Sequence, residues 1–97
     1  MGEVLYKKTD KKLFESSLGA DTVLLDEDTG TYYSMNLVSS SIWKSLSSQQ
    51  SAESIVAHLL SLYNVPSETC KAETDRILSE FLEQGLIEIV NLSLIHI

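Results

Sequence analysis

The sequence is short of cysteine, proline and basic residues, and each shortage excludes a class of protein. Its single cysteine, Cys70, cannot form an intramolecular disulfide. One proline and four glycines, with no low-complexity tract, predict neither a linker nor a disordered tail. Seven Lys and Arg against fourteen Asp and Glu give a net charge of −7, which repels the phosphates of nucleic acids. We therefore expect one folded domain over residues 1–97 that does not bind nucleic acid.

Targeting and membrane signals are absent as well. The start Met1-Gly2-Glu3-Val4-Leu5-Tyr6 lacks the basic-then-apolar order of a secretion signal, and Tyr6 stands where N-myristoylation needs Ser or Thr. No apolar run approaches the length that crosses a bilayer. The sequence predicts a cytoplasmic protein with no membrane role.

What the first third does contain is the pattern of a small antiparallel sheet. Short segments rich in apolar, aromatic and β-branched residues are separated by the turn signals Gly19-Ala20-Asp21 and Asp28-Thr29-Gly30. Gly30 suits a hairpin loop because it takes positive φ without a Cβ clash. The acidic run 26–28 is interpreted as a solvated turn. The predicted strands of this meander are 12–17, 22–25 and 31–35.

After the third strand the apolar spacing changes to the helical period of about 3.6 residues. Asn36 and Ser51 are expected to cap two helices. Pro66 breaks the chain, Ser67 is expected to cap a third helix, and Gly85 is expected to end it. This order predicts an α+β fold that is winged helix-turn-helix-like, with a three-stranded antiparallel sheet followed by three helices. The apolar stripe of the third helix consists of Cys70, Thr74, Ile77, Leu78, Phe81 and Leu82.

The same patterns predict where three aromatic residues lie. Trp43 is expected at the centre of the core. Tyr32 and Tyr33 point to opposite faces of their strand, so one is buried and the other is available to a ligand. The alternation alone does not decide which.

The tail, residues 86–97, is rich in Ile, Leu and Val and predicts a further extended segment. It is too apolar to remain in water. Three alternatives stay open: the tail covers its own sheet, pairs with a second chain to form a homodimer, or docks a partner enzyme.

No motif in the chain predicts catalysis, a metal site or a cofactor. Asp28-Thr29-Gly30 is the tripeptide of aspartic proteases, but Glu27 precedes it where an apolar strand is needed. Cys70 lies on an apolar stripe, and His58 and His96 have no ligand spacing. The acidic turn lacks the alternating oxygen ligands of a calcium loop. The basic cluster is interpreted as a solvated N-terminal arm, with the steering of an acidic peptide or protein as the alternative. Its members are Lys7, Lys8, Lys11 and Lys12.

A family resemblance covers most of the chain, from about Leu13 to Val90. The stretch 23–36 has an apolar run, an acidic turn ending in glycine, two aromatics and the pair Met35-Asn36, and Ile42-Trp43 follows. This pattern resembles the PqqD-like family, which includes the precursor-peptide recognition elements of ribosomally made, modified peptides. The segments 51–56 and 83–87 add further matches at the second and third helices.

The resemblance implies a protein that binds the leader segment of a precursor peptide as an added strand. The leader would lie antiparallel to the third strand and against the third helix, and a separate processing protease or modifying enzyme would be the second partner. Leu78 and Phe81 are expected to form an apolar pocket with Lys71 and Asp75 at its rim. The implied contacts are Thr31, Tyr32, Tyr33, Ser34 and Met35 on the strand and Lys71, Thr74, Asp75, Leu78 and Phe81 on the helix.

Two alternatives accompany this interpretation. Within the family, 28–33 and Ile42-Trp43 are most similar to stand-alone leader-binding proteins of lasso-peptide clusters, and the alternative is a pyrroloquinoline quinone pathway chaperone that partners a radical-SAM enzyme. The alternative of another class is a winged-helix DNA-binding regulator. Against it stand the acidic residues of the third helix, which are Glu68, Glu73, Asp75, Glu80 and Glu83.

Overall fold

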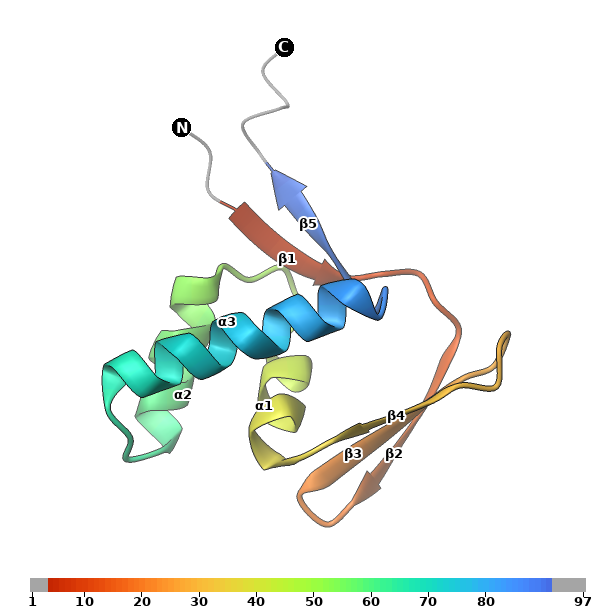
Figure 1. Ribbon diagram of the computed structural model, residues 1–97, viewed down its shortest axis with the longest axis horizontal. Helices are drawn as coiled ribbons and strands as arrows, with labels where there is room; N and C mark the ends of the chain where they lie inside the picture. Colours follow the sequence, from red (N-terminus) through yellow and green to blue (C-terminus); the bar gives the residue numbers. More distant parts are fainter. Residues whose placement is uncertain (1–3, 92–97) are drawn as a thin grey trace.

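The computed structural model describes residues 4–91, in which two small sheets pack around three helices (Figure 1). The predicted α+β class and the order of sheet followed by helices are confirmed. Among these residues no helix is long and apolar enough to span a bilayer. The elements are β1 Val4–Lys8, β2 Leu13–Leu18, β3 Asp21–Asp26, β4 Tyr32–Met35, α1 Leu37–Ser45, α2 Ala52–Leu62, α3 Ser67–Glu83 and β5 Ile87–Asn91.

The predicted meander forms the larger sheet, with the strand order β2-β3-β4 and antiparallel pairing throughout. Gly19 and Gly30 take positive φ values of 66° and 76° in the two turns, as their lack of a Cβ permits. The register pairs Leu24 with Tyr33 and Thr22 with Met35. Because Thr22, Leu24 and Met35 are all buried, these residues define the face of the sheet that packs on the helices.

The smaller sheet pairs β1 with β5, and it was not expected from the sequence. Lys7 pairs with Glu88 and both lysines of β1 are half-buried, so the prediction of a solvated arm is wrong for Lys7 and Lys8. The backbone of Tyr6 also exchanges two hydrogen bonds with Gln50, which ties β1 to the loop before α2. The predicted extended tail is confirmed for β5, while residues 92–97, including His96, lie outside the described part of the chain.

The three helices begin and end close to their predicted positions. The side chain of Asn36 accepts from the N–H of Ser39 at 3.0 Å, and that of Ser51 accepts from the N–H of Ser54 at 3.1 Å. Ser67 does not cap α3 as expected: it is the first helical residue, and the extended Pro66 precedes it without a side-chain hydrogen bond. Gly85, with a φ of 72°, follows the end of α3.

Trp43 lies at the centre of the packing, as expected. Its ring meets Phe81 of α3 edge-on, with centroids 5.8 Å apart and planes at 83°. Its Nε1 donates to Glu15 Oε1 of β2 at 3.0 Å, and the Lys8 ammonium lies 4.2 Å from the ring centroid. Burial lowers the pKa of Lys8, and the Glu15 carboxylate opposes that shift. The buried apolar cluster consists of Leu24, Met35, Ile42, Trp43, Leu46, Ile55, Leu59, Cys70, Ile77, Leu78, Phe81, Leu86 and Ile87.

Asp26 holds the hairpin loop between β3 and β4. Its Oδ1 accepts from the N–H groups of Asp28 at 3.0 Å and Thr29 at 3.3 Å, and its Oδ2 lies 3.3 Å from the Lys11 ammonium. The residue is only 2% exposed, so the prediction of a solvated turn is wrong for Asp26, although Glu27 and Asp28 are exposed. Burial alone would raise the pKa of Asp26, but the two N–H groups and Lys11 outweigh it and lower the pKa from the ordinary 3.8.

The lowered pKa of Asp26 predicts a pH-dependent stability. A carboxyl whose pKa is lower in the folded state stabilises that state above its ordinary value of 3.8, and this contribution disappears as the pH falls through the folded pKa. Asp26→Asn should therefore lower the melting temperature at neutral pH, and the deficit should shrink in acid. Thermal unfolding across pH checks this, with the exposed Glu27→Gln as control. A deficit equally large in strong acid would contradict the assignment.

Candidate functional site

The strand β4 lies at one edge of the larger sheet and, among residues 4–91, pairs only with β3. The Asp26 N–H donates to the Thr31 carbonyl at 2.8 Å, so Asp26 and Thr31 are a hydrogen-bonded pair of the antiparallel ladder. Because alternate residues of an antiparallel strand face the same neighbour, Thr31, Tyr33 and Met35 direct their backbone groups toward β3. Tyr32 and Ser34 therefore present their N–H and C=O groups along the free edge of β4.

The side chains of β4 alternate between the two faces of the sheet. Tyr33 is half-buried against the core and Met35 is buried, so both point toward the helices. Tyr32 is 70% exposed and, like Ser34, points to the opposite face. Of the two tyrosines, Tyr32 is the one exposed to solvent. Thr31, also exposed, immediately precedes the strand.

The end of β4 is held firmly by α1, which begins two residues after Met35. The Ser40 hydroxyl donates to the Met35 carbonyl at 3.1 Å, and Ser40 itself is buried. The Asn36 cap fixes the entry of the chain into the helix. The free edge therefore has a fixed position relative to the helices before any ligand binds.

Three of the five helix residues singled out from the sequence lie in the core. Thr74 is fully buried, and Leu78 and Phe81 are 2% and 4% exposed. Phe81 packs edge-on against Trp43. These side chains therefore pack in the core beneath α3 and hold the helix in place, and they do not form an open pocket.

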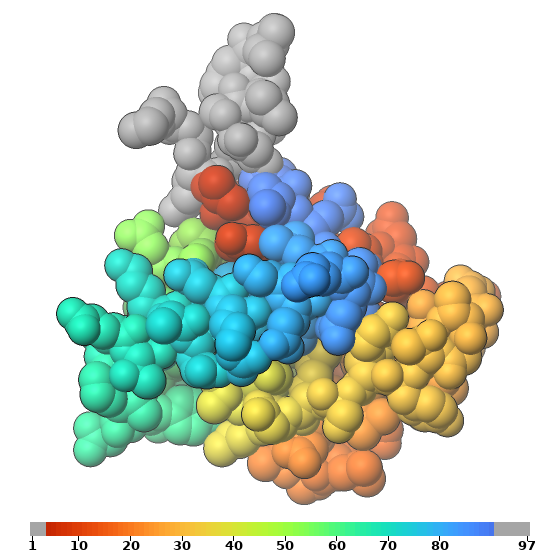
Figure 2. Space-filling view, in the orientation of Figure 1, coloured from red at the N-terminus to blue at the C-terminus, as the bar shows by residue number. Residues whose placement is uncertain are grey.

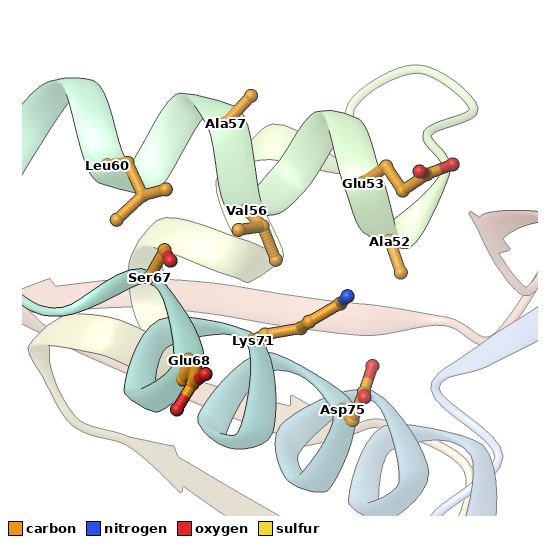
Figure 3. A pocket seen from close by; sticks show the side chains of 9 residues that line it. All are labelled: Ala52, Glu53, Val56, Ala57, Leu60, Ser67, Glu68, Lys71 and Asp75. Atoms are coloured by element: carbon orange, nitrogen blue, oxygen red, sulfur yellow. The ribbon is translucent and has the colours of Figure 1, made fainter.

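The remaining two, Lys71 and Asp75, lie on the flank of α3 that faces α2. They line a hollow of about 350 Å³ between these helices, and Figure 3 shows Lys71 extending along it. Its apolar wall comes from α2, and its complete lining is Ala52, Glu53, Val56, Ala57, Leu60, Ser67, Glu68, Lys71 and Asp75. The lining of this hollow contains no residue of β4.

The flank of α3 that faces α1 contains Glu73, which sequence reasoning did not select. Glu73 lines a small apolar hollow with Val38, the second residue of α1, and in Figure 2 the atoms of α3 border those of α1. Since Glu73 is two residues from both Lys71 and Asp75, helical spacing places it on the other side of the helix. Helical spacing alone could have separated the two flanks, but it could not have identified which one faces α1.

This flank is acidic with one arginine. Arg76 pairs with Glu73 and Glu80, and all three side chains are about half exposed. The hydrogen bond to Glu73, then the charge of the carboxylates, raises the pKa of Arg76 further. No group of three or more His, Cys, Asp or Glu residues within 4–91 is placed to hold a metal ion. The structure therefore offers a free backbone edge at β4 and a charged flank of α3 on the side of α1.

Comparison with known proteins identifies two similarities. The family model described as coenzyme PQQ synthesis protein D (PqqD) matches residues 21–87, from β3 to the start of β5. A solved structure, "TbiB1 in Complex with the TbiA(beta) Leader Peptide", is similar with a TM-score of 0.74 and 28% identity, over 84% of this chain and 94% of that one. No curated protein matches. The family resemblance read from the sequence is thereby confirmed.

Thr74 provides a test of the core beneath this site. Its buried hydroxyl has no hydrogen-bond partner within the described residues, which costs folding free energy. Thr74→Val removes the hydroxyl and should raise the free energy of unfolding by about 1 kcal/mol. Chemical denaturation measures the change, and the exposed Thr69→Val is the matched control. A clear loss of stability in Thr74→Val would show that the hydroxyl has a partner after all.

Proposed function

We propose that this chain, which belongs to the PqqD family, binds the leader segment of a ribosomally made precursor peptide along the free edge of β4. The observation that carries the proposal is the pair of residues, Tyr32 and Ser34, whose backbone groups are directed away from the sheet. The similar solved structure is a complex with a leader peptide, which supports the same class of ligand.

An added strand is a binding mode that this edge suits physically. Tyr32 and Ser34 together offer two N–H donors and two C=O acceptors, and an antiparallel guest strand would satisfy all of them. Such hydrogen bonds depend little on the guest's sequence. Because the edge is already fixed by the Met35 and Asn36 contacts with α1, little ordering of the protein opposes binding.

The side chains implied by the family resemblance take unequal parts in this proposal. Tyr32 and Ser34 form the free edge, and Thr31, Tyr33 and Met35 hold it on β3. Leu78 with Phe81 hold the supporting surface of α3 in place. Thr74 supports it in the same way. Lys71 and Asp75 meet only a guest that continues across the hollow between α2 and α3.

The chain acts in this proposal by binding alone, and a separate processing protease or modifying enzyme carries out the chemistry. A lasso-peptide type of pathway is favoured because residues 28–33 and Ile42-Trp43 are most similar to the stand-alone leader-binding proteins of lasso-peptide clusters. A second candidate, a chaperone of pyrroloquinoline quinone synthesis that partners a radical-SAM enzyme, is favoured by the description of the family model. Both share leader binding and differ in the enzyme recruited.

Ser34→Pro tests the edge directly. The substitution removes an N–H that faces the free edge, not β3, so the sheet should keep its own hydrogen bonds. With a labelled leader from a precursor encoded beside this chain, we expect the dissociation constant to rise roughly tenfold or more, from the lost hydrogen bond and the clash of the ring. Fluorescence anisotropy measures it.

Ser17→Pro is the matched control, since Ser17 lies on β2 at the opposite edge and its backbone also faces away from β3. It should leave leader binding unchanged. Circular dichroism of both variants checks that the fold is retained. Equal binding by wild type and a folded Ser34→Pro variant would exclude strand addition at β4.

A further inference from the structure

The face of the larger sheet that points away from the helices is apolar. Strand alternation places on it the neighbours of the buried residues Thr22, Leu24 and Met35. Phe14 is 61% exposed, Leu18 65% and Tyr32 70%. We call this surface the outer face; it contains a shallow hollow of about 270 Å³, lined by Phe14, Ser16, Leu18, Val23, Leu25 and Tyr32.

The residues of the outer face form two cross-strand rows that end at the free edge of β4. In the first row Phe14 pairs with Leu25, and Leu25 pairs with Tyr32. In the second row Ser16 pairs with Val23, and Val23 pairs with Ser34. The first row is therefore large and apolar, and the second is small. Residues of both rows line the hollow, together with Leu18.

Both rows end at residues whose backbone groups face the free edge. A guest strand that pairs with Tyr32 and Ser34 places the residues directly opposite them on the outer face, because paired residues of an antiparallel ladder share a face. These two guest positions are two residues apart. One extends the row of Phe14, Leu25 and Tyr32, and the other lies beside the small side chains of the second row.

We infer, on the basis of the proposed function, that the outer face selects the guest peptide through these two positions. The residue opposite Tyr32 is aromatic or branched aliphatic and continues the apolar row. The residue opposite Ser34 is large and apolar, and it lies over Ser34 and Val23 toward the hollow. The peptide class is therefore an extended segment with apolar residues at alternate positions, in addition to the side chains that face α3.

A guest strand fits this face better than a second copy of the chain. The net charge of −7 opposes self-association, and Asp21, paired with Leu18, would add a carboxylate from each copy at such an interface. Continuity also favours the guest, since Tyr32 belongs both to the outer face and to the edge where the backbone is free.

The experiment selects peptides without assuming a natural ligand. A displayed library of random peptides is enriched on the wild-type chain, and the strongest binder is synthesised with a label. We expect enriched sequences to carry apolar residues two positions apart. The double variant Phe14→Ser with Tyr32→Ser should weaken that peptide at least fivefold, whereas Leu62→Ser, at an exposed leucine of α2, should not.

A double-mutant cycle connects the two sides of the contact. Replacing the two apolar peptide residues by serine should weaken binding to the wild type, but hardly further to the double variant. Two results would overturn the inference and leave the proposed function standing. The first is that the losses from the peptide and protein substitutions are additive. The second is that the folded double variant binds the peptide as well as the wild type does, while Ser34→Pro still weakens peptide binding. If Ser34→Pro does not weaken the binding of any enriched peptide, the inference and the proposed function are both contradicted. A wild-type dimer that the double variant converts to monomer, with peptide binding unchanged, would assign the outer face to a second copy.

Discussion

The packing of Trp43 is the interaction on which the position of the free edge depends. Its indole contacts Phe81 of α3 and donates a hydrogen bond to Glu15 of β2, and the Lys8 ammonium of β1 lies over the face of its ring. One side chain of α1 thus joins both sheets and the last helix. The contact with Phe81 is apolar and the other two are polar, so the ring is fixed in orientation as well as in depth. Leu24 and Met35 of the larger sheet belong to the same buried cluster, so these contacts act together with the direct continuation of β4 into α1.

The consequence for binding is that the edge and its supporting helix are arranged before a ligand arrives. Ser40 and Asn36 fix the end of β4, and Asp26 fixes its beginning through the hairpin loop. Both ends of a strand of only four residues, Tyr32–Met35, are therefore held by buried or capped contacts. A guest strand then orders itself against a prepared template, and the cost of ordering falls on the guest alone. This arrangement suits the recognition of an unstructured leader.

The local features of the fold were predictable from the sequence, and the long-range ones were not. The meander, the caps at Asn36 and Ser51, and the stop at Gly85 depend on residues a few positions apart. The strand β1 was missed because its partner, β5, lies at the other end of the described chain. The sequence predicts a solvated Asp26 because its burial and its ion pair with Lys11 depend on the tertiary structure, although its two N–H partners are local. At the site, the positions of the strand residues could be predicted, because they follow from the alternation of side chains along β4. The positions of Lys71 and Asp75 could not, because the packing of the three helices decides which flank of α3 faces α2 and helical periodicity carries no information on that packing.

An unpaired strand edge normally invites aggregation, and the way this chain limits that risk bears on its selectivity. The free edge of β4 is short, since only Tyr32 and Ser34 direct backbone groups outward, and the chain carries a net charge of −7. Two residues of ladder supply too few hydrogen bonds to hold a strand of arbitrary sequence tightly. Side chains on both sides of the edge must then add to them. One side has the acidic flank of α3 with Glu73 and Glu80, and the other has an apolar row that ends at Tyr32. Because the edge is short and the two surfaces beside it differ, a peptide binds only if its side chains fit both of them.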